Sequence, residues 1–375
     1  MAKYKLGDIV TLLNGRAYLM PELQDSGKYR ILRVGNLSGG NDSWYYSDME
    51  LDENKYCENG DLLYAWACNF GPHIWREEKV IYHYHIWKLV ENKEKVDRTY
   101  LYYYLLHQTP FYLGGVNGAT MVHITKKNME KKTVYIPSSL NVQHCIASIL
   151  STYDSLIENN AKRIRLLEKM AENLYKEWFV RFRFPGHENV EMENGLPKGW
   201  SRGSLSDVCE FKRGKNITSS EMEEGNVPVI SAGLEPSGYH SCSNVRRVNV
   251  TMSSSGANAG YIAIHYSDIW AADCSYIKEA TTDNIYYVYE LLNNIRNVIN
   301  NFQRGAAQPH VYPKDVNRIK LILPSKELML KANGRLEIMH NEIYNFQKQN
   351  SLLARQRDLL LPRLMSGKLE VKVKE

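Results

Sequence analysis

The chain has 375 residues, of which 43% are hydrophobic and 24% are charged, and its formal net charge is +5. This length predicts two or three domains, and the hydrophobic share suffices for their cores. The mild positive charge permits a polyanionic partner without requiring one. Six scattered cysteines without a CxxC pair exclude the usual zinc spacings and a disulfide framework. No apolar run reaches the 18 residues of a transmembrane helix and no signal peptide is recognised, so we expect a cytoplasmic protein.

The first half begins with Leu6-Gly7-Asp8-Ile9, followed by Gly15. Its interior is rich in β-formers, and the run VIYHYHIWKLV at 80–90 predicts one strand. The run TYLYYYLLHQ at 99–108 predicts a short helix. A long heptad pattern follows from residue 146 and predicts a coiled-coil helix that ends before Pro185-Gly186.

The second half repeats this order. Leu205-Ser206-Asp207-Val208 is followed by Gly214, and short apolar runs at 227–233, 249–260 and 261–266 alternate with turn residues. Residues 284–302 predict a helix. A second heptad pattern begins at Leu336, and we expect Pro362 to kink or stop that helix.

The two halves share an internal repeat. Gly118, Ala119, His123, Lys127 and Pro137 recur at one offset as Gly305, Ala306, His310, Lys314 and Pro324. The copies agree at their edges and differ in their interiors, which favours one scaffold that carries two different recognition surfaces. His123, His310, Gly118 and Gly305 are therefore assigned to the shared framework.

Each heptad pattern contains one asparagine at a seam position, Asn160 in the first and Asn350 in the second. If these two residues face each other, an antiparallel pairing places apolar positions opposite one another and Tyr153 opposite Arg357. The alternative is that the two helices pack on unrelated surfaces. The predicted coiled-coil seam comprises Ile146, Leu150, Ile157, Asn160, Ile164, Leu167, Leu174, Leu336, Ile343, Phe346, Asn350 and Leu353.

These patterns predict an α+β fold with two β-rich domains in a pseudo-two-fold arrangement, separated by two long antiparallel coiled-coil helices. Thirty helical residues span about 45 Å. One turn of B-DNA is roughly 34–36 Å, so two such domains could read a duplex a turn or more apart.

Three stretches are similar to the specificity subunit of type I restriction–modification enzymes: LIENNAKRIRLLEKMAENLYKEWFVRF (156–182), LPKGWSRGSLSDV (196–208) and QRDLLLPRLMSGKLEV (356–371). The resemblance covers essentially the whole chain. It implies target-recognition domains at 1–140 and 196–326, and conserved spacer helices at 141–184 and 327–368. It also implies that the chain reads a bipartite, asymmetric site in double-stranded DNA. The implied partners are two methyltransferase subunits and restriction (translocase) subunits, and no membrane.

No catalytic motif is recognised in the chain. It lacks GxGxxG after a strand, GxxxxGK[ST] and [ND]PP[YF]. Glu77-Glu78-Lys79 is an ExK fragment, which favours a solvated turn over a nuclease site, and His83 with His85 lack a third metal ligand. We therefore expect no catalysis, no metal and no cofactor in this chain. The resemblance implies S-adenosylmethionine, ATP and Mg²⁺ for the partner subunits.

Residues for DNA binding are proposed by chemistry, since Arg and Lys bind phosphate, Arg pairs with guanine, and Asn or Gln pairs with adenine. Arg16, Lys212, Arg213 and Lys215 flank the two glycines, where a missing side chain would let the backbone approach the duplex. The predicted base readers are Arg33, Asn36, Trp66, Asn69, Arg76, Arg246, Arg247, Ser255, Asn258, Arg304 and Gln308. The alternative function is a non-enzymatic coiled-coil adaptor whose β-domains bind proteins.

Overall fold

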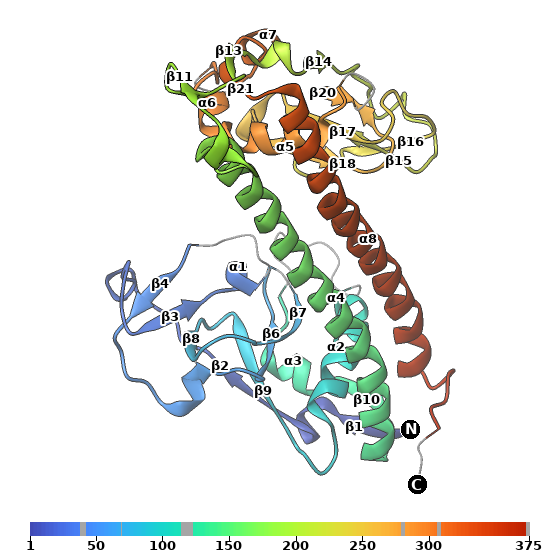
Figure 1. Ribbon diagram of the computed structural model, residues 1–375. Helices are drawn as coiled ribbons and strands as arrows, with labels where there is room; N and C mark the ends of the chain where they lie inside the picture. The colour runs from blue at the N-terminus through green and yellow to red at the C-terminus, as the bar shows by residue number, and fades with distance from the viewer. Residues whose placement is uncertain (38–42, 69, 114–122, 279–281, 306–308, 373–375) are drawn as a thin grey trace. The chain divides into compact units, whose positions relative to one another are not determined.

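The computed structural model describes residues 1–37, 43–68, 70–113, 123–278, 282–305 and 309–372 (Figure 1). Contacts divide the chain into two compact units. Unit 1 is Met1–Glu158 with Asn350–Glu375, and unit 2 is Asn159–Gln349. Five residues named above lie outside the described residues: Asn69, Gly118, Ala119, Ala306 and Gln308.

Unit 1 is a β-rich region with short helices. Its strands are β1 (Ala2–Lys5), β2 (Val10–Asn14), β3 (Tyr29–Leu32), β4 (Tyr45–Ser47), β5 (Tyr56–Cys57), β6 (Leu62–Ala65), β7 (Gly71–Ile74), β8 (Val80–Tyr82), β9 (Ile86–Glu91) and β10 (Thr133–Ile136). Its helices are α1 (Val34–Leu37), α2 (Arg98–Leu113) and α3 (Lys126–Glu130), with 3-10 turns η1 (Leu6–Asp8), η2 (Met20–Glu22) and η3 (Glu53–Lys55).

Unit 2 is β-rich as well. Its strands are β11 (Met192–Glu193), β12 (Leu196–Pro197), β13 (Ser201–Ser204), β14 (Lys212–Arg213), β15 (Val227–Ile230), β16 (Gly238–His240), β17 (Asn249–Ser253), β18 (Ile262–His265), β19 (Trp270–Ala271), β20 (Cys274–Lys278) and β21 (Lys320–Leu323). Its helices are α5 (Ile285–Asn294), α6 (Arg296–Asn300) and α7 (Pro313–Val316), with 3-10 turns η5 (His187–Asn189), η6 (Leu205–Asp207) and η7 (Gly256–Asn258).

Two long helices contribute residues to both units. They are α4 (Leu140–Tyr175), which continues as the π-helical turn η4 (Lys176–Val180), and α8 (Lys326–Met365). In unit 1, Ile146 of α4 and Leu364 of α8 belong to the core, and in unit 2 Ala171 and Leu336 do. The heptad patterns therefore correspond to real helices whose apolar side chains are buried in both units. Pro362 is expected to kink or stop this helix; it does not stop it, because α8 continues to Met365.

The sheet topology of the two units corresponds except for β5, the fourth strand of its sheet in unit 1, which has no equivalent in the three-stranded sheet of unit 2, and this correspondence confirms the internal repeat. Unit 1 has the orders β2-β9-β6-β7, β4-β3-β8-β5 and β1-β10, and unit 2 has β14-β20-β17-β18, β16-β15-β19 and β13-β21. The strand registers agree as well. Ala65 pairs with Ile86 in unit 1, and Ser253 pairs with Cys274 in unit 2. This correspondence aligns the two copies residue by residue at the ends of the central strands.

Two predicted elements are interrupted. The run at 80–90 is two strands, β8 and β9, separated by the turn 83–85, and β8 pairs in one sheet while β9 pairs in another. The helix at 284–302 is broken at Ile295 into α5 and α6. In both places a continuous run of β-formers or helix-formers hides a change of direction that tertiary packing imposes.

The pairing of α4 with α8 is antiparallel. Asn160 Nδ2 donates to Gln349 Oε1 at 3.1 Å in unit 2, and Asn350 Nδ2 donates to the Ile157 carbonyl at 3.3 Å in unit 1. The predicted facing of the two asparagine positions is therefore correct to within one residue. Arg357, predicted opposite Tyr153, forms an ion pair from Nη1 with the adjacent Asp154 at 2.5 Å, which is again a difference of one residue.

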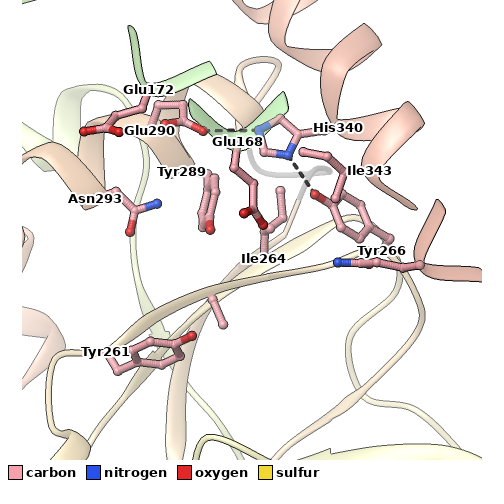
Figure 2. Close-up of a pocket in the computed structure, with 12 residues that line it drawn as sticks. Glu168, Glu172, Tyr261, Ile264, Tyr266, Tyr289, Glu290, Asn293, His340 and Ile343 are labelled. Carbon is pink, nitrogen blue, oxygen red and sulfur yellow. Dashed lines mark hydrogen bonds and ion pairs between the residues drawn. The ribbon is translucent and has the colours of Figure 1, made fainter. Parts of the chain in front are cut away.

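A buried polar group fixes α8 to the sheet of unit 2 (Figure 2). His340 is 1% exposed, and its Nδ1 lies 2.7 Å from the hydroxyl of Tyr266. Its Nε2 lies 3.3 Å from the carboxylate of Glu290 on α5. With the ring proton on Nε2, the tyrosine hydroxyl donates to Nδ1 and the carboxylate faces the N–H. A cavity of about 400 Å³, also lined by Glu168, lies beside this group.

Trp178 lies on η4, at the end of the first heptad pattern. Trp178 is 6% exposed and belongs to the core of unit 2. The Arg335 guanidinium lies over its ring at 5.3 Å from the centroid. Trp178 is therefore a core residue.

Candidate nucleic-acid interface

The turn between β8 and β9 carries a group of aromatic side chains in unit 1. Trp66, which follows β6, donates from its backbone N–H to the His85 carbonyl at 3.1 Å and from its indole to the Tyr84 carbonyl at 2.8 Å. Its ring stacks on that of Trp87 with centroids 5.8 Å apart. Tyr84 is 39% exposed. The stacked rings of Trp87 and Trp66 therefore connect the core of unit 1 with the surface turn that carries Tyr84.

The two histidines of this turn are neutral donors and acceptors. Burial, together with the nearby His85 and Arg33, lowers the pKa of His83 to about 4, and burial also lowers the pKa of His85. Their ring centroids are 4.8 Å apart. Both histidines lie in the turn 83–85, which interrupts the single strand predicted over 80–90. The described part of the chain contains no group of three metal-ligating side chains.

Glycines position the chain beside these turns in both units. Gly15 donates to the Ile86 carbonyl at 3.3 Å, and Gly214 donates to the equivalent Cys274 carbonyl at 2.8 Å. A Cβ on Gly15 would lie 2.4 Å from two carbonyl oxygens, those of Tyr82 and His83. The missing side chain thus admits a neighbouring backbone of the same chain. This differs from the predicted reason, which was close approach to a duplex.

Arg16, the predicted phosphate anchor of unit 1, is hydrogen-bonded to the turn between β8 and β9. We call this turn (83–85), together with the segment after Gly15, the corner of unit 1. Its backbone N–H donates to the Tyr82 carbonyl at 3.0 Å, and its carbonyl accepts from Tyr84 at 3.0 Å. Its guanidinium lies 2.7 Å from the Glu22 carboxylate and over the Tyr18 ring. The Arg16 guanidinium is therefore held in an ion pair within unit 1.

The equivalent corner of unit 2 is built around Asp273. Ser255 Oγ donates to Asp273 Oδ2 at 2.7 Å, and Arg213 Nη2 lies 3.5 Å from Oδ1. Lys215 donates from its backbone N–H to the Ala271 carbonyl at 2.9 Å and accepts from the Trp270 indole at 2.8 Å. The structure therefore brings two of the predicted residues, Arg213 and Ser255, to a carboxylate that the sequence did not single out, and it holds the Lys215 backbone against the strand that precedes this carboxylate.

The repeated histidines take equivalent places beside these corners. His123 forms a β-bridge with Ala67, and His310 forms one with Ser255. His310 also bridges Arg304, whose guanidinium lies 2.9 Å from Asp315. Both histidines thus hold the returning chain against the end of a central strand, as expected for framework residues.

Arg246 and Arg247 lie apart from the Asp273 turn of unit 2, whereas Arg33 of unit 1 is close to His83. Arg246 and Arg247 precede β17, whereas Ser255 follows it, so they are at opposite ends of a five-residue strand that spans about 17 Å. Arg76 is paired with Glu158 of α4 at 2.5 Å. Arg33 Nη2 donates to the Ser43 carbonyl at 3.2 Å.

The remaining predicted DNA-binding residues are placed as follows. Asn36 Nδ2 also donates to the Ser43 carbonyl, at 3.1 Å. Lys212 is exposed on β14, and Asn258 ends η7. The predicted ExK run is held by ion pairs, with Glu77 on Arg30 and Lys79 on Glu53. Among the predicted DNA-binding residues that the structure describes, none lines the cavity beside His340.

The seam residues are at least partly buried throughout. Ile146, Leu150, Asn160, Leu336 and Ile343 are buried, and Ile157, Ile164, Leu167, Leu174, Phe346, Asn350 and Leu353 are intermediate. Within the described residues, no helix is long and apolar enough to cross a membrane.

Comparison with known proteins places the chain in a family. The family model "Type I restriction modification DNA specificity domain" matches residues 1–169 and 197–352. The type I restriction enzyme MjaIX specificity subunit of Methanocaldococcus jannaschii is 26% identical over 309 residues, which cover 74% of this chain and 71% of that protein. A putative type I specificity subunit of Mycoplasma genitalium, S.MgeORF438P, is 26% identical over 281 residues, or 74% of this chain and 73% of that protein.

A solved structure has the same fold. The crystal structure of a type I restriction–modification S subunit from M. genitalium aligns with a TM-score of 0.65 at 21% identity, covering 97% of this chain and 95% of that one. The chain belongs to the type I restriction modification DNA specificity domain family, and it is a non-catalytic DNA sequence-recognition subunit.

Proposed function

We propose that the chain reads a bipartite, asymmetric site in double-stranded DNA, one half with each β-rich region, and that it scaffolds the catalytic subunits of a type I restriction–modification enzyme. The observation that carries this proposal is the repeated topology with different side chains at equivalent corners. Trp66 and His85 in unit 1 correspond in register to Ser254 and Asp273 in unit 2. One scaffold with two chemistries suits two unlike half-sites, whereas a symmetric dimer reads a palindrome.

The partners in this proposal are two methyltransferase subunits and restriction (translocase) subunits, acting in the cytoplasm. Methyl transfer to a flipped adenine takes place in the methyltransferase subunits, so S-adenosylmethionine, ATP and Mg²⁺ are assigned to the partners. The long helices α4 and α8 act as the spacer and as the docking element.

The test is to co-express the chain with its methyltransferase subunit and to map methylated adenines in host DNA by single-molecule sequencing. The expected result is a split motif, with two short fixed blocks around unread bases. Replacing residues 1–140 by those of another family member should change one block only. A stable complex that leaves host DNA unmethylated would instead support an adaptor that binds proteins.

The spacer role has its own test. Inserting one heptad in α4 and one in α8 should change the number of unread bases and leave both blocks intact. Blocks that change while the spacing stays the same would contradict the division into readers and spacer.

A further inference from the structure

The turn that precedes the last central strand differs between the two copies. Tyr82 and Ala271 are equivalent, because each carbonyl accepts a hydrogen bond from the residue that follows the repeated glycine. The donor is Arg16 for Tyr82 and Lys215 for Ala271. Ile86 and Cys274 are also equivalent. Three residues (83–85) thus separate these positions in unit 1, and two (272–273) separate them in unit 2. On a shared scaffold, this turn differs in both length and chemistry.

The chemistry of the unit 2 turn is that of a fixed hydrogen-bond acceptor. The Asp273 side chain is 34% exposed, so its carboxylate reaches the surface. Ser255 holds Oδ2 and Arg213 faces Oδ1, which sets the orientation of the carboxylate and offsets its charge. Each carboxylate oxygen has a second lone pair for a further donor.

We propose that Asp273 reads a base with an exocyclic amine, cytosine N4 or adenine N6, in the half-site of unit 2. In the major groove these amines are donors, whereas guanine O6 and thymine O4 at the same places are acceptors. A carboxylate attracts the first pair and repels the second, so it selects as well as binds. Ser255 is a positioning residue, which acts through the carboxylate.

The counterpart of Asp273 in unit 1 is an imidazole and not a carboxylate, so it carries no negative charge. His85 stands in register with Asp273, and its ring lies edge-on to Trp66 at 5.0 Å. The added residue in this turn is accompanied by the exposed ring of Tyr84. The proposed preference of Asp273 for amine-bearing bases therefore applies to one block of the recognition motif and not to the other.

The experiment rests on the proposed function and uses the complex of the full chain with its methyltransferase subunit. The probes are duplexes in which each position of both mapped blocks is changed in turn. With Asp273→Asn, one position of the unit 2 block should lose about tenfold or more of its discrimination between amine-bearing and keto bases, since one base pair is worth about 1–3 kcal/mol. The asparagine keeps an oxygen for Ser255 but adds a donor for the keto bases.

Two further variants make the result decisive. Glu235→Gln, an exposed acid of the same unit, is the matched control and should leave both blocks unchanged. Ser255→Ala should weaken discrimination at the position that Asp273→Asn affects and at no other, a pattern that general destabilisation does not produce. It also tests the proposal if Asp273→Asn fails to fold.

The outcomes separate the two proposals. A wild-type complex that yields no split motif would refute the proposed function. A split motif whose unit 2 block is unchanged by both Asp273→Asn and Ser255→Ala would overturn the present inference alone. Relaxation in the unit 1 block would overturn it as well.

Discussion

Replacing Gly214 by alanine tests the close approach of β14 to the turn after β19. The added Cβ would lie 2.4 Å from the Ala272 carbonyl oxygen and 2.6 Å from that of Ala271. Both contacts are shorter than real Cβ atoms show, and both involve backbone, which cannot rotate away. The β14 backbone must therefore move.

The magnitude follows from what that movement breaks. Two backbone hydrogen bonds lie next to the clash, Gly214 N–H to the Cys274 carbonyl at 2.8 Å and Lys215 N–H to the Ala271 carbonyl at 2.9 Å. Each contributes about 0.5–1.5 kcal/mol, and overpacking alone costs about 1–3 kcal/mol. We expect unit 2 to lose roughly 2–6 kcal/mol, which lowers the Tm of a unit of this size by about 4–24 °C.

The assay is calorimetry of the full-length chain. Gly15→Ala, the equivalent change in unit 1, identifies which transition belongs to which unit. Gly334→Ala is the matched control, because no atom lies within 4 Å of its Cβ position in α8, and it should raise stability by up to about 1 kcal/mol. A Tm for Gly214→Ala within about a degree of wild type would refute the steric reasoning.

Three further predictions concern pH, the helix pair and the aromatic corner. Burial lowers the pKa of His265 to about 4, so between about pH 6.5 and 4 the unfolded chain binds a proton that the folded chain does not. Because of His265, the free energy of unfolding should be highest above pH 6.5 and fall by up to about 3 kcal/mol toward pH 4. Urea unfolding measured at several pH values should show a smaller dependence on pH for His265→Gln. Arg357→Met leaves the Asp154 carboxylate with the Tyr103 hydroxyl as its partner and should cost about 1–3 kcal/mol, discounted for partial exposure, in urea unfolding; an additive double cycle with Asp154→Asn would contradict a direct coupling. Trp66→Ala removes the stack on Trp87 and should alter the unit 1 block of the methylation motif alone, so a change in both blocks would count against it.

The internal repeat and the heptad periodicity could be recognised from the sequence. A heptad is a local pattern, and a repeat is a similarity between two parts of the same chain. The edges of both copies and the antiparallel register of α4 and α8 could be read from spacing alone. The turn 83–85 could not, because tyrosine and isoleucine favour strands on both sides of it and only the placement of β8 and β9 in different sheets reveals the break.

The candidate site was legible in part for a similar reason. Side-chain chemistry pointed to Arg213 and Ser255, but Asp273 is an isolated acid in the sequence and carries no pattern. It gains meaning from two contacts, with residues 18 and 60 positions away. Arg16 and Arg76 were proposed as DNA ligands, and their ion pairs with Glu22 and Glu158 depend on contacts that no motif encodes.

The equal placement of His123 and His310 bears on how such a gene can change. Each histidine forms a β-bridge just beyond the end of a central strand, β6 in unit 1 and β17 in unit 2. In each unit a short helix and a strand then lead from the histidine into a long helix. A crossover between the two copies at these codons would remove one full repeat and join the first β-rich region to α8 without breaking a fold element. The shortened product would carry one reading surface. Two copies would have to associate to recover a second surface, and the sequence they recognise would then be a palindrome. Duplication within the chain is thus what frees the two half-sites to diverge separately.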